Sequence, residues 1–256
     1  MTLSEIQEKI IKNPPVDFGD IFGKAFELFK MVWLQGFLLL LLGILIQYGL
    51  SLIMYIPALG MEFMVDEQSL DGDFNVMAIV LGVLFFVLYL AVLIAVTTFN
   101  FGLQAAFYRI VRVRDRNKQT EQGVNFGMFL KKEHIKKLFV LSMAQMGITI
   151  VALMLCVIPI FYVFVPLQFA IIIFAFNPDL TINDIYTAAF KLGNAKWGVT
   201  FGLVFVLGLL AVIIGLIACF IGVYFTLSIV YLPAYLIYKE VVGFYEDDEA
   251  IAQIGR

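Results

Sequence analysis

Long apolar runs separated by short polar stretches dominate this sequence. A helix that crosses the hydrocarbon core of a bilayer needs about 20 apolar residues. Residues 34–56 form a run of that length, which ends at Pro57. Residues 76–108 contain no charged residue, and this run is longer than one crossing requires. We expect the part beyond the bilayer to continue as a helix that carries the arginines at 109–116.

Two further charge-free blocks, 138–177 and 198–238, are each too long for a single crossing. Pro159 interrupts the first block and glycines interrupt the second, so each is predicted to be a hairpin of two spans. The pattern therefore predicts an all-α, polytopic membrane protein with six transmembrane helices in three hairpins. The expected parts are a polar N-terminal segment, 1–15, a membrane domain, 16–240, an acidic cytoplasmic tail, 241–256, and spans at about 34–56, 76–100, 138–157, 160–177, 198–217 and 222–238.

Two similar half-polar phrases precede predicted spans, DIFGKAFELFK at 20–30 and DIYTAAFKLGN at 184–194. Their polar and apolar positions alternate with a helical period, which predicts an amphipathic helix in each place. Asp17 and Thr181 are candidate N-caps, each with an aspartate three residues later. We expect both helices to lie in the cytoplasmic interface and to turn into the membrane at a tryptophan. The residues assigned to these interfacial helices are Asp20, Phe22, Phe26, Phe29, Trp33, Asp184, Tyr186, Phe190 and Trp197.

The likeness of the two phrases has two explanations. Any helix that enters a bilayer has this composition, but the number of ungapped matches favours an internal duplication. A weaker third copy at 124–139, which opens with VNFG as residues 16–19 read VDFG, would place another interfacial helix before the third span.

Composition excludes several classes of protein. Of the 256 residues, 62% are apolar and 14% are charged, and the mean hydropathy is +0.97. A soluble domain has about 45–50% apolar and 25% charged residues. Basic residues are few and the isoelectric point is about 5.2, so nucleic acid is not an expected partner. Cys156 and Cys219 lie in apolar runs, where they are small apolar side chains or, alternatively, a disulfide pair.

The charges predict an orientation. All 17 Lys and Arg residues lie before the first predicted span, in 109–137, in 191–196 or after the sixth predicted span. The loop 57–75 has five acidic residues and no basic one. Because positive residues mark the cytoplasmic side, both termini are expected in the cytoplasm.

The second phrase and its surroundings resemble a broad group of bacterial six-span membrane proteins. The group includes the membrane domain of some glycerophosphodiester phosphodiesterases and families of unknown function. The shared features are Pro159, Pro166, Asp179, the helix from Ala188 to Lys196 and Trp197. The resemblance covers most of the chain and implies six spans in a bacterial cytoplasmic (inner) membrane. Its motifs are architectural, and Gln168 stands where many relatives carry a basic residue.

The predicted spans contain no Asp, Glu, Lys, Arg or His, so we expect no enzyme activity, no cofactor and no metal site. Uncharged polar residues in spans are usually hydrogen-bond partners between helices, and a ligand pocket is the alternative. The basic segment either only sets the topology or additionally binds anionic lipid headgroups or an acidic partner. The candidate pocket residues are Gln104, Gln145 and Gln168, and the candidate lipid contacts are Arg109, Arg112, Arg114, Lys131, Lys132, Lys136 and Lys137.

Two functions are compatible with this sequence. The first is a non-catalytic membrane protein that organises lipids or membrane protein partners through its cytoplasmic helices. The second is a facilitator or transporter of a lipid or other apolar molecule, with a pocket between the hairpins. A cavity lined by Gln145 and Gln168 would favour the second function.

Overall fold

The computed structural model describes residues 1–12, 14–64, 72–116, 125–155, 158–218 and 222–244. These residues form helices and connecting turns, without a strand among them. The helices in chain order are α1 (Leu3–Lys12), α2 (Phe18–Met64), α3 (Gly72–Asp115), the 3₁₀ helix η1 (Met128–Leu130), α4 (Lys132–Met154), α5 (Ile158–Phe176), α6 (Ile182–Ala195), α7 (Trp197–Ile217), α8 (Gly222–Thr226), the 3₁₀ helix η2 (Leu227–Tyr231) and α9 (Leu232–Val241).

Five helices in the described part of the chain are long and apolar enough to cross a membrane. They are α2, α3, α4, α5 and α7. Their apolar side chains are widely exposed: Met154 is 82% exposed, and Ile158 and Ile217 are each 80% exposed. Exposure of so much apolar surface is favourable in lipid and unfavourable in water. The chain therefore has the character of a multi-pass helical membrane protein.

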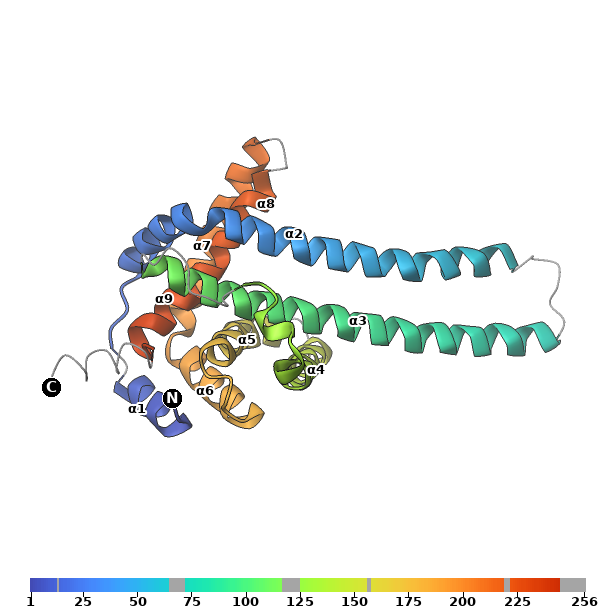
Figure 1. Ribbon diagram of the computed structural model, residues 1–256, viewed down its shortest axis with the longest axis horizontal. Helices are drawn as coiled ribbons and strands as arrows, with labels where there is room; N and C mark the ends of the chain where they lie inside the picture. The colour runs from blue at the N-terminus through green and yellow to red at the C-terminus, as the bar shows by residue number, and fades with distance from the viewer. Residues whose placement is uncertain (13, 65–71, 117–124, 156–157, 219–221, 245–256) are drawn as a thin grey trace.

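The long helices diverge from a common centre. In Figure 1, α2 and α3 run side by side to the right, α7 and α8 project upward, and α4 and α5 are seen nearly end-on. The end of α3, the start of α2, α6 and α9 gather on the left, where α1 also lies. We call this region the hub.

The hub contains most of the buried core. Tyr108 of α3, Phe174 of α5, Leu192 of α6 and Tyr235 of α9 are all fully or almost fully buried. Helix α1 packs on α6 and buries Ile6 and Ile10 in the same cluster. Burying an aliphatic or aromatic side chain contributes about 1.5–3 kcal/mol. The hub is thus the part of the molecule that packs protein against protein.

Local signals place the helix starts as the sequence predicted. The Asp17 carboxylate accepts a hydrogen bond of 2.8 Å from the backbone N–H of Asp20, at the first turn of α2. The Thr181 hydroxyl accepts one of 3.2 Å from the N–H of Asp184 and donates to the Asp184 carboxylate. Both N-caps are confirmed, because each satisfies a backbone donor that the helix itself leaves without an acceptor. The predicted extension of the second run is confirmed through Arg114, since α3 ends at Asp115 and Arg116 follows in a turn.

The first phrase is not a separate helix. Helix α2 runs for 47 residues without a break, so residues 18–33 and the first predicted span form one element. No proline or asparagine and only one glycine, Gly36, lies between residues 24 and 42, so no residue favours a break at Trp33. The second phrase does form its own helix, α6, which ends before Trp197.

Two other expectations differ from the structure. The first part of the third phrase forms η1, and the rest belongs to α4, which begins at Lys132, six residues before the predicted span. The third phrase is therefore not a separate interfacial helix. The stretch predicted as a sixth span contains two short helices joined by a 3₁₀ helix at Leu227–Tyr231. Pro233 has no N–H to donate to Ile229, which explains why the α-helical pattern stops there. Cys156 and Cys219 lie outside the described residues.

Candidate ligand-binding site

The apolar residues expected to face lipid in the first phrase contact the protein core. Ile21, Ala25, Leu28 and Val32 are buried, and Phe22, Phe26 and Phe29 pack partly buried against the same core cluster. Asp20 pairs with Lys24 at the helix surface, at 2.6 Å. Trp33 is 44% exposed and lies beside the ring of Phe225. The apolar face is thus largely covered by protein.

The second phrase is covered in the same way. Ile185, Ala189 and Leu192, at the positions of Ile21, Ala25 and Leu28, are also buried. The Tyr186 hydroxyl donates to the carbonyl of Leu141 at 2.8 Å, and the Trp197 indole donates to the carbonyl of Tyr162 at 3.1 Å. Phe190 is partly exposed. Burial lowers the pKa of the Lys196 ammonium, which donates to the Pro14 carbonyl at 2.6 Å and fixes the chain between α6 and α7.

The structure divides the predicted basic cluster. Arg109 and Arg112 point into a cavity in the hub, and Arg112 is only 6% exposed. The Lys137 ammonium donates to the carbonyls of Pro178 and Leu180, at the turn after α5. The remaining members, Arg114, Lys131, Lys132 and Lys136, are exposed.

Three adjoining cavities lie along α2 and α3, outside the hub. Their volumes are about 330, 400 and 230 Å³. Gln47 of α2 lines all three, and Asn100 and Gln104 of α3 line two of them. Gln145 of α4 lines the first. We call these three neighbouring cavities together the amide groove, after Gln47, Asn100, Gln104 and Gln145.

Hydrogen bonding and close helix packing fix the position of Asn100 in the amide groove. Asn100 donates from Nδ2 to the Val96 carbonyl at 3.0 Å, and its Oδ1 lies against Gly43 of α2. A Cβ atom on Gly43 would come within 2.8 Å of that oxygen, so a larger residue at position 43 would displace the Asn100 side chain. Helical spacing puts Asn100 and Gln104 on one face of α3. The groove therefore presents a row of amides with apolar walls.

One amide oxygen in the groove lacks a donor. Gln145 Oε1 is buried and has no hydrogen-bond partner among the described residues. A buried acceptor without a donor costs about 1–3 kcal/mol. Gln168 Oε1 is also buried and lacks a partner in the described part of the chain, but Gln168 does not line the groove.

Of the three predicted pocket residues, the structure brings two together, Gln104 and Gln145. Gln47 and Asn100 were not assigned to a pocket from the sequence. The spacing of four residues between Asn100 and Gln104 was a usable signal, because such residues share a helix face. The approach of Gln47 depends on how α2 packs on α3, which no local pattern encodes.

The described lining of the groove contains no Asp, Glu, His, Lys, Arg or Cys. Among the described residues, no group of three or more His, Cys, Asp or Glu side chains could hold a metal ion. The site can therefore offer apolar contact and uncharged hydrogen bonds. This chemistry suits binding of an apolar molecule with a neutral polar head.

Comparisons with known proteins add no family to this description. No protein-family model, no curated protein and no solved structure matches the chain. The resemblance to bacterial six-span membrane proteins accordingly stays a prediction from the sequence.

Proposed function

We propose that this protein is a non-catalytic integral membrane protein that binds a lipid, or another apolar molecule with a neutral polar head, in the amide groove. The observation that carries the proposal is the buried, unpaired oxygen of Gln145, a residue that lines one cavity together with Gln47, Asn100 and Gln104. A hydroxyl or amide N–H of a ligand can donate to this oxygen.

The shape of the groove supports an elongated ligand. Its cavities extend from Tyr231 near the hub, past Gln47, to Tyr55 and Phe85 on the projecting α2–α3 hairpin. The apolar walls suit a hydrocarbon chain, and the amides suit one uncharged head. A charged head is disfavoured, because the described lining offers no counter-ion and a low-dielectric surrounding makes an unpaired charge costly.

The organisation of partners by the cytoplasmic helices remains a prediction. Contact of the apolar faces of 18–32 and α6 with lipid does not support it, because those faces pack in the protein core. The expected interaction with lipids can instead be assigned to the amide groove. A facilitator that moves the same ligand across the membrane is the alternative use of this site.

We also propose six crossings with both termini in the cytoplasm of a bacterium, the last crossing being α8, η2 and α9 together. The described cations support this orientation, since they lie on α1, the start of α2, the end of α3, the start of α4, α6, Lys196 and α9, which belong to or adjoin the hub. Cysteines introduced at Ser4 and at Ser69, a position outside the described residues, should be labelled from opposite sides of the membrane. Labelling of both from one side would contradict the topology.

Binding can be tested with a fluorescent diacylglycerol, which has two chains and one hydroxyl. The protein in mild detergent should bind this probe, and a triacylglycerol of similar size without a hydroxyl should bind at least about fivefold more weakly. The substitution Gln145→Leu removes the oxygen and should abolish this preference.

Gln168→Leu is the matched control, because Gln168 Oε1 is equally buried and unpaired but lies outside the groove. It should leave the preference unchanged. Equal binding of the two probes, or equal effects of the two substitutions, would contradict the proposal. Flux of the probe between vesicle leaflets, measured with the same variants, separates a facilitator from a protein that only binds.

A further inference from the structure

The face of α2 that points away from α3 carries a regular row of large exposed side chains. Gly43 lies against Asn100 of α3, and helical spacing puts Leu45 and Leu52 on the opposite side of α2. In Figure 1 the right-hand half of α2 runs with α3 beside it and with no other described helix alongside. Over this half the row comprises Leu38, Leu41, Leu45, Tyr48, Leu52 and Tyr55, and the last four are 59–65% exposed. We call this row the heptad face.

Successive members of the heptad face are alternately three and four residues apart. The same spacing continues back to Met31 and Leu34, which are 44% and 47% exposed. A row with a mean period of 3.5 residues is the a/d pattern of a coiled coil. On a straight α-helix such a row drifts by about 20° per heptad, and left-handed winding around a second helix removes this drift. The spacing therefore suits a helical partner, whereas contact with acyl chains requires no such period.

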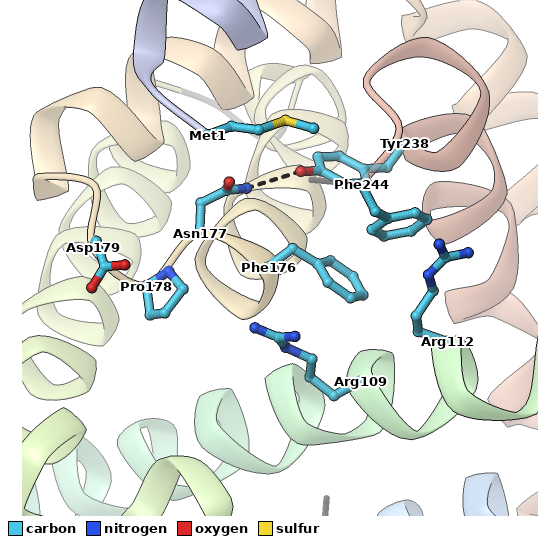
Figure 2. A pocket seen from close by; sticks show the side chains of 9 residues that line it. All are labelled: Met1, Arg109, Arg112, Phe176, Asn177, Pro178, Asp179, Tyr238 and Phe244. Carbon is cyan, nitrogen blue, oxygen red and sulfur yellow. Dashed lines mark hydrogen bonds between the residues drawn. The ribbon is translucent and has the colours of Figure 1, made fainter. Parts of the chain in front are cut away.

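Tyr48 gives the heptad face a polar group, which matters because lipid tails compete with purely apolar contacts between helices. Two other tyrosines are hydrogen-bonded within the chain. Tyr186 donates to a carbonyl of α4 at 2.8 Å, and Figure 2 shows the Tyr238 hydroxyl, which accepts from Asn177 at 2.9 Å. Tyr48 is 65% exposed, and its hydroxyl has no hydrogen bond to another described residue. It lies inside the apolar run 34–56, where a hydroxyl without a partner is unfavourable.

Gly49 adds a small residue at the edge of the heptad face, one helical turn from Leu45 and from Leu52. A Cβ atom at position 49 would meet nothing within 4 Å, so packing within the described part of the chain does not require glycine there. Glycine inside a helix is less favourable than alanine. Small residues let the backbones of two membrane helices approach closely. A partner on the heptad face explains a glycine that the described contacts leave unexplained.

We infer that the heptad face is an interface with a second copy of this chain, in which two α2 helices pack in parallel about a two-fold axis along the membrane normal. Copies inserted in one orientation bring each layer against itself, leucine on leucine and Tyr48 on Tyr48. A phenol both donates and accepts, so two copies of Tyr48 can hydrogen-bond to each other. Residues 31–61 contain no charged residue, so repulsion between like charges does not oppose this pairing.

This interface goes beyond the proposed binding function and can be tested separately from it. Leu45, Gly49 and Leu52 line none of the three cavities of the amide groove. Tyr48 and Tyr55 do border the groove. Substitutions at 45, 49 and 52 therefore address the pairing and leave the lining of the groove intact.

Disulfide cross-linking in membranes measures the proximity of two copies. The full chain, with Cys156 and Cys219 replaced by alanine, receives one new cysteine at a time and is oxidised with copper phenanthroline. Leu52→Cys should give at least about five times more cross-linked dimer than Leu84→Cys of α3. Leu84 is the matched control, because the two leucines are 63% and 64% exposed. A cysteine scan of positions 44–52 should show maxima at 45, 48 and 52.

Energy transfer between donor-labelled and acceptor-labelled copies in phosphatidylcholine vesicles measures the association itself. Gly49→Leu should weaken it by about tenfold or more, because the new side chain fills the space in which the two backbones approach. Gly82→Leu in α3 is the matched control, since a Cβ atom there also meets nothing within 4 Å. It should change the association by less than about twofold. Leucine is a better helix former than glycine, so neither substitution weakens its own helix.

Three results would each overturn the inference. The first is that Leu52→Cys forms no more dimer than Leu84→Cys. The second is that Leu52→Cys cross-links to a protein of another mass in place of a second copy. The third is that Gly82→Leu weakens the association as much as Gly49→Leu does.

Discussion

Residues 20–33 and 184–197 have similar sequences, and the protein uses them differently. The first segment is the opening of one 47-residue helix, whereas the second is a helix of 14 residues that ends before the next span begins. In the first segment, Lys30 and Leu34 are good helix formers. At the equivalent positions the second segment has Asn194 and Gly198, which are poorer helix formers.

The two segments also differ in how much of their surface is covered. Each buries the same apolar stripe, but α6 additionally buries Ala188 and Gly193, whose counterparts are the exposed Lys24 and the half-buried Phe29. Helix α6 packs against α5 on one side and α1 on another. A side chain as large as phenylalanine fits where one side faces outward, and only glycine fits where α5 approaches closely.

The comparison shows that an amphipathic pattern identifies the buried stripe but not what covers it. An apolar face has the same composition whether it meets lipid or protein, since both remove it from water. Substitutions in the two segments measure how much the stability of each depends on protein contacts.

The largest effect is expected from replacing Phe22, Phe26 and Phe29 together by serine. Three half-buried phenylalanines should contribute about 2–4.5 kcal/mol to the free energy of unfolding, because a fully buried one contributes about 1.5–3 kcal/mol. Thermal or denaturant unfolding in detergent measures this loss. Phe86→Ser, at a position that is 60% exposed, should cost far less.

The opposite result would reverse this interpretation. If the triple variant keeps its stability in detergent but residues 17–31 become accessible to protease in vesicles, these phenylalanines contact lipid and not protein.

A smaller loss is expected from Gly193→Ala in α6. The added Cβ would lie 2.8 Å from the Cα of Pro166 in α5, and backbone cannot rotate away as a side chain does. Overpacking of this kind costs about 1–3 kcal/mol. Gly198→Ala, where nothing lies within 4 Å of the new Cβ, should be neutral or stabilising. Equal unfolding temperatures for the two variants would show that α6 does not need its close approach to α5.

Tyr186→Phe tests a contact that the first segment lacks, since its counterpart is Phe22. Loss of the hydrogen bond to the Leu141 carbonyl should lower the free energy of unfolding by about 1 kcal/mol. Tyr162→Phe removes an exposed hydroxyl that donates to Asn194 at 2.7 Å and is expected to have a smaller effect. A larger loss from Tyr162→Phe would argue that α6 is anchored to α5 and not to α4.

The smallest effect concerns the surface of the first segment. Lys24 pairs with Asp20 at 2.6 Å and with Glu240 of α9 at 2.7 Å, and it is about half exposed. Lys24→Ala should therefore cost about 0.5 kcal/mol at low salt and nothing measurable in 1 M salt, because exposed ion pairs are weak and screened. A loss that does not change with salt would indicate that the lysine stem packs on the core.

Much of the secondary structure could be predicted from the sequence. The apolar runs predicted five long helices that the structure contains, and the caps at Asp17 and Thr181 were recognisable from two residues each. These features depend on neighbours within one or two helical turns. The end of the second phrase as a separate helix was predictable for the same reason, and the continuity of α2 past Trp33 could have been expected from its lack of helix breakers.

The candidate sites were predictable only in part. Gln104 and Gln145 were singled out as polar residues in apolar surroundings, but their meeting with Gln47 requires α2, α3 and α4 to pack in one particular arrangement. Arg112 shows the same limit. Its neighbours in sequence are those of a surface cation, and only the packing of α3 against α5 and α9 buries it beside Phe244.

The sequence by itself determined that the chain is helical, that it belongs in a bilayer, and where most helices begin, because propensity, capping and hydropathy act locally. The tertiary structure alone decided which apolar faces meet protein, how the long helices diverge from the hub, and which polar residues share a cavity. These outcomes depend on contacts between residues far apart in the chain. Local sequence does not encode them, because an apolar side chain is removed from water equally well by lipid and by protein.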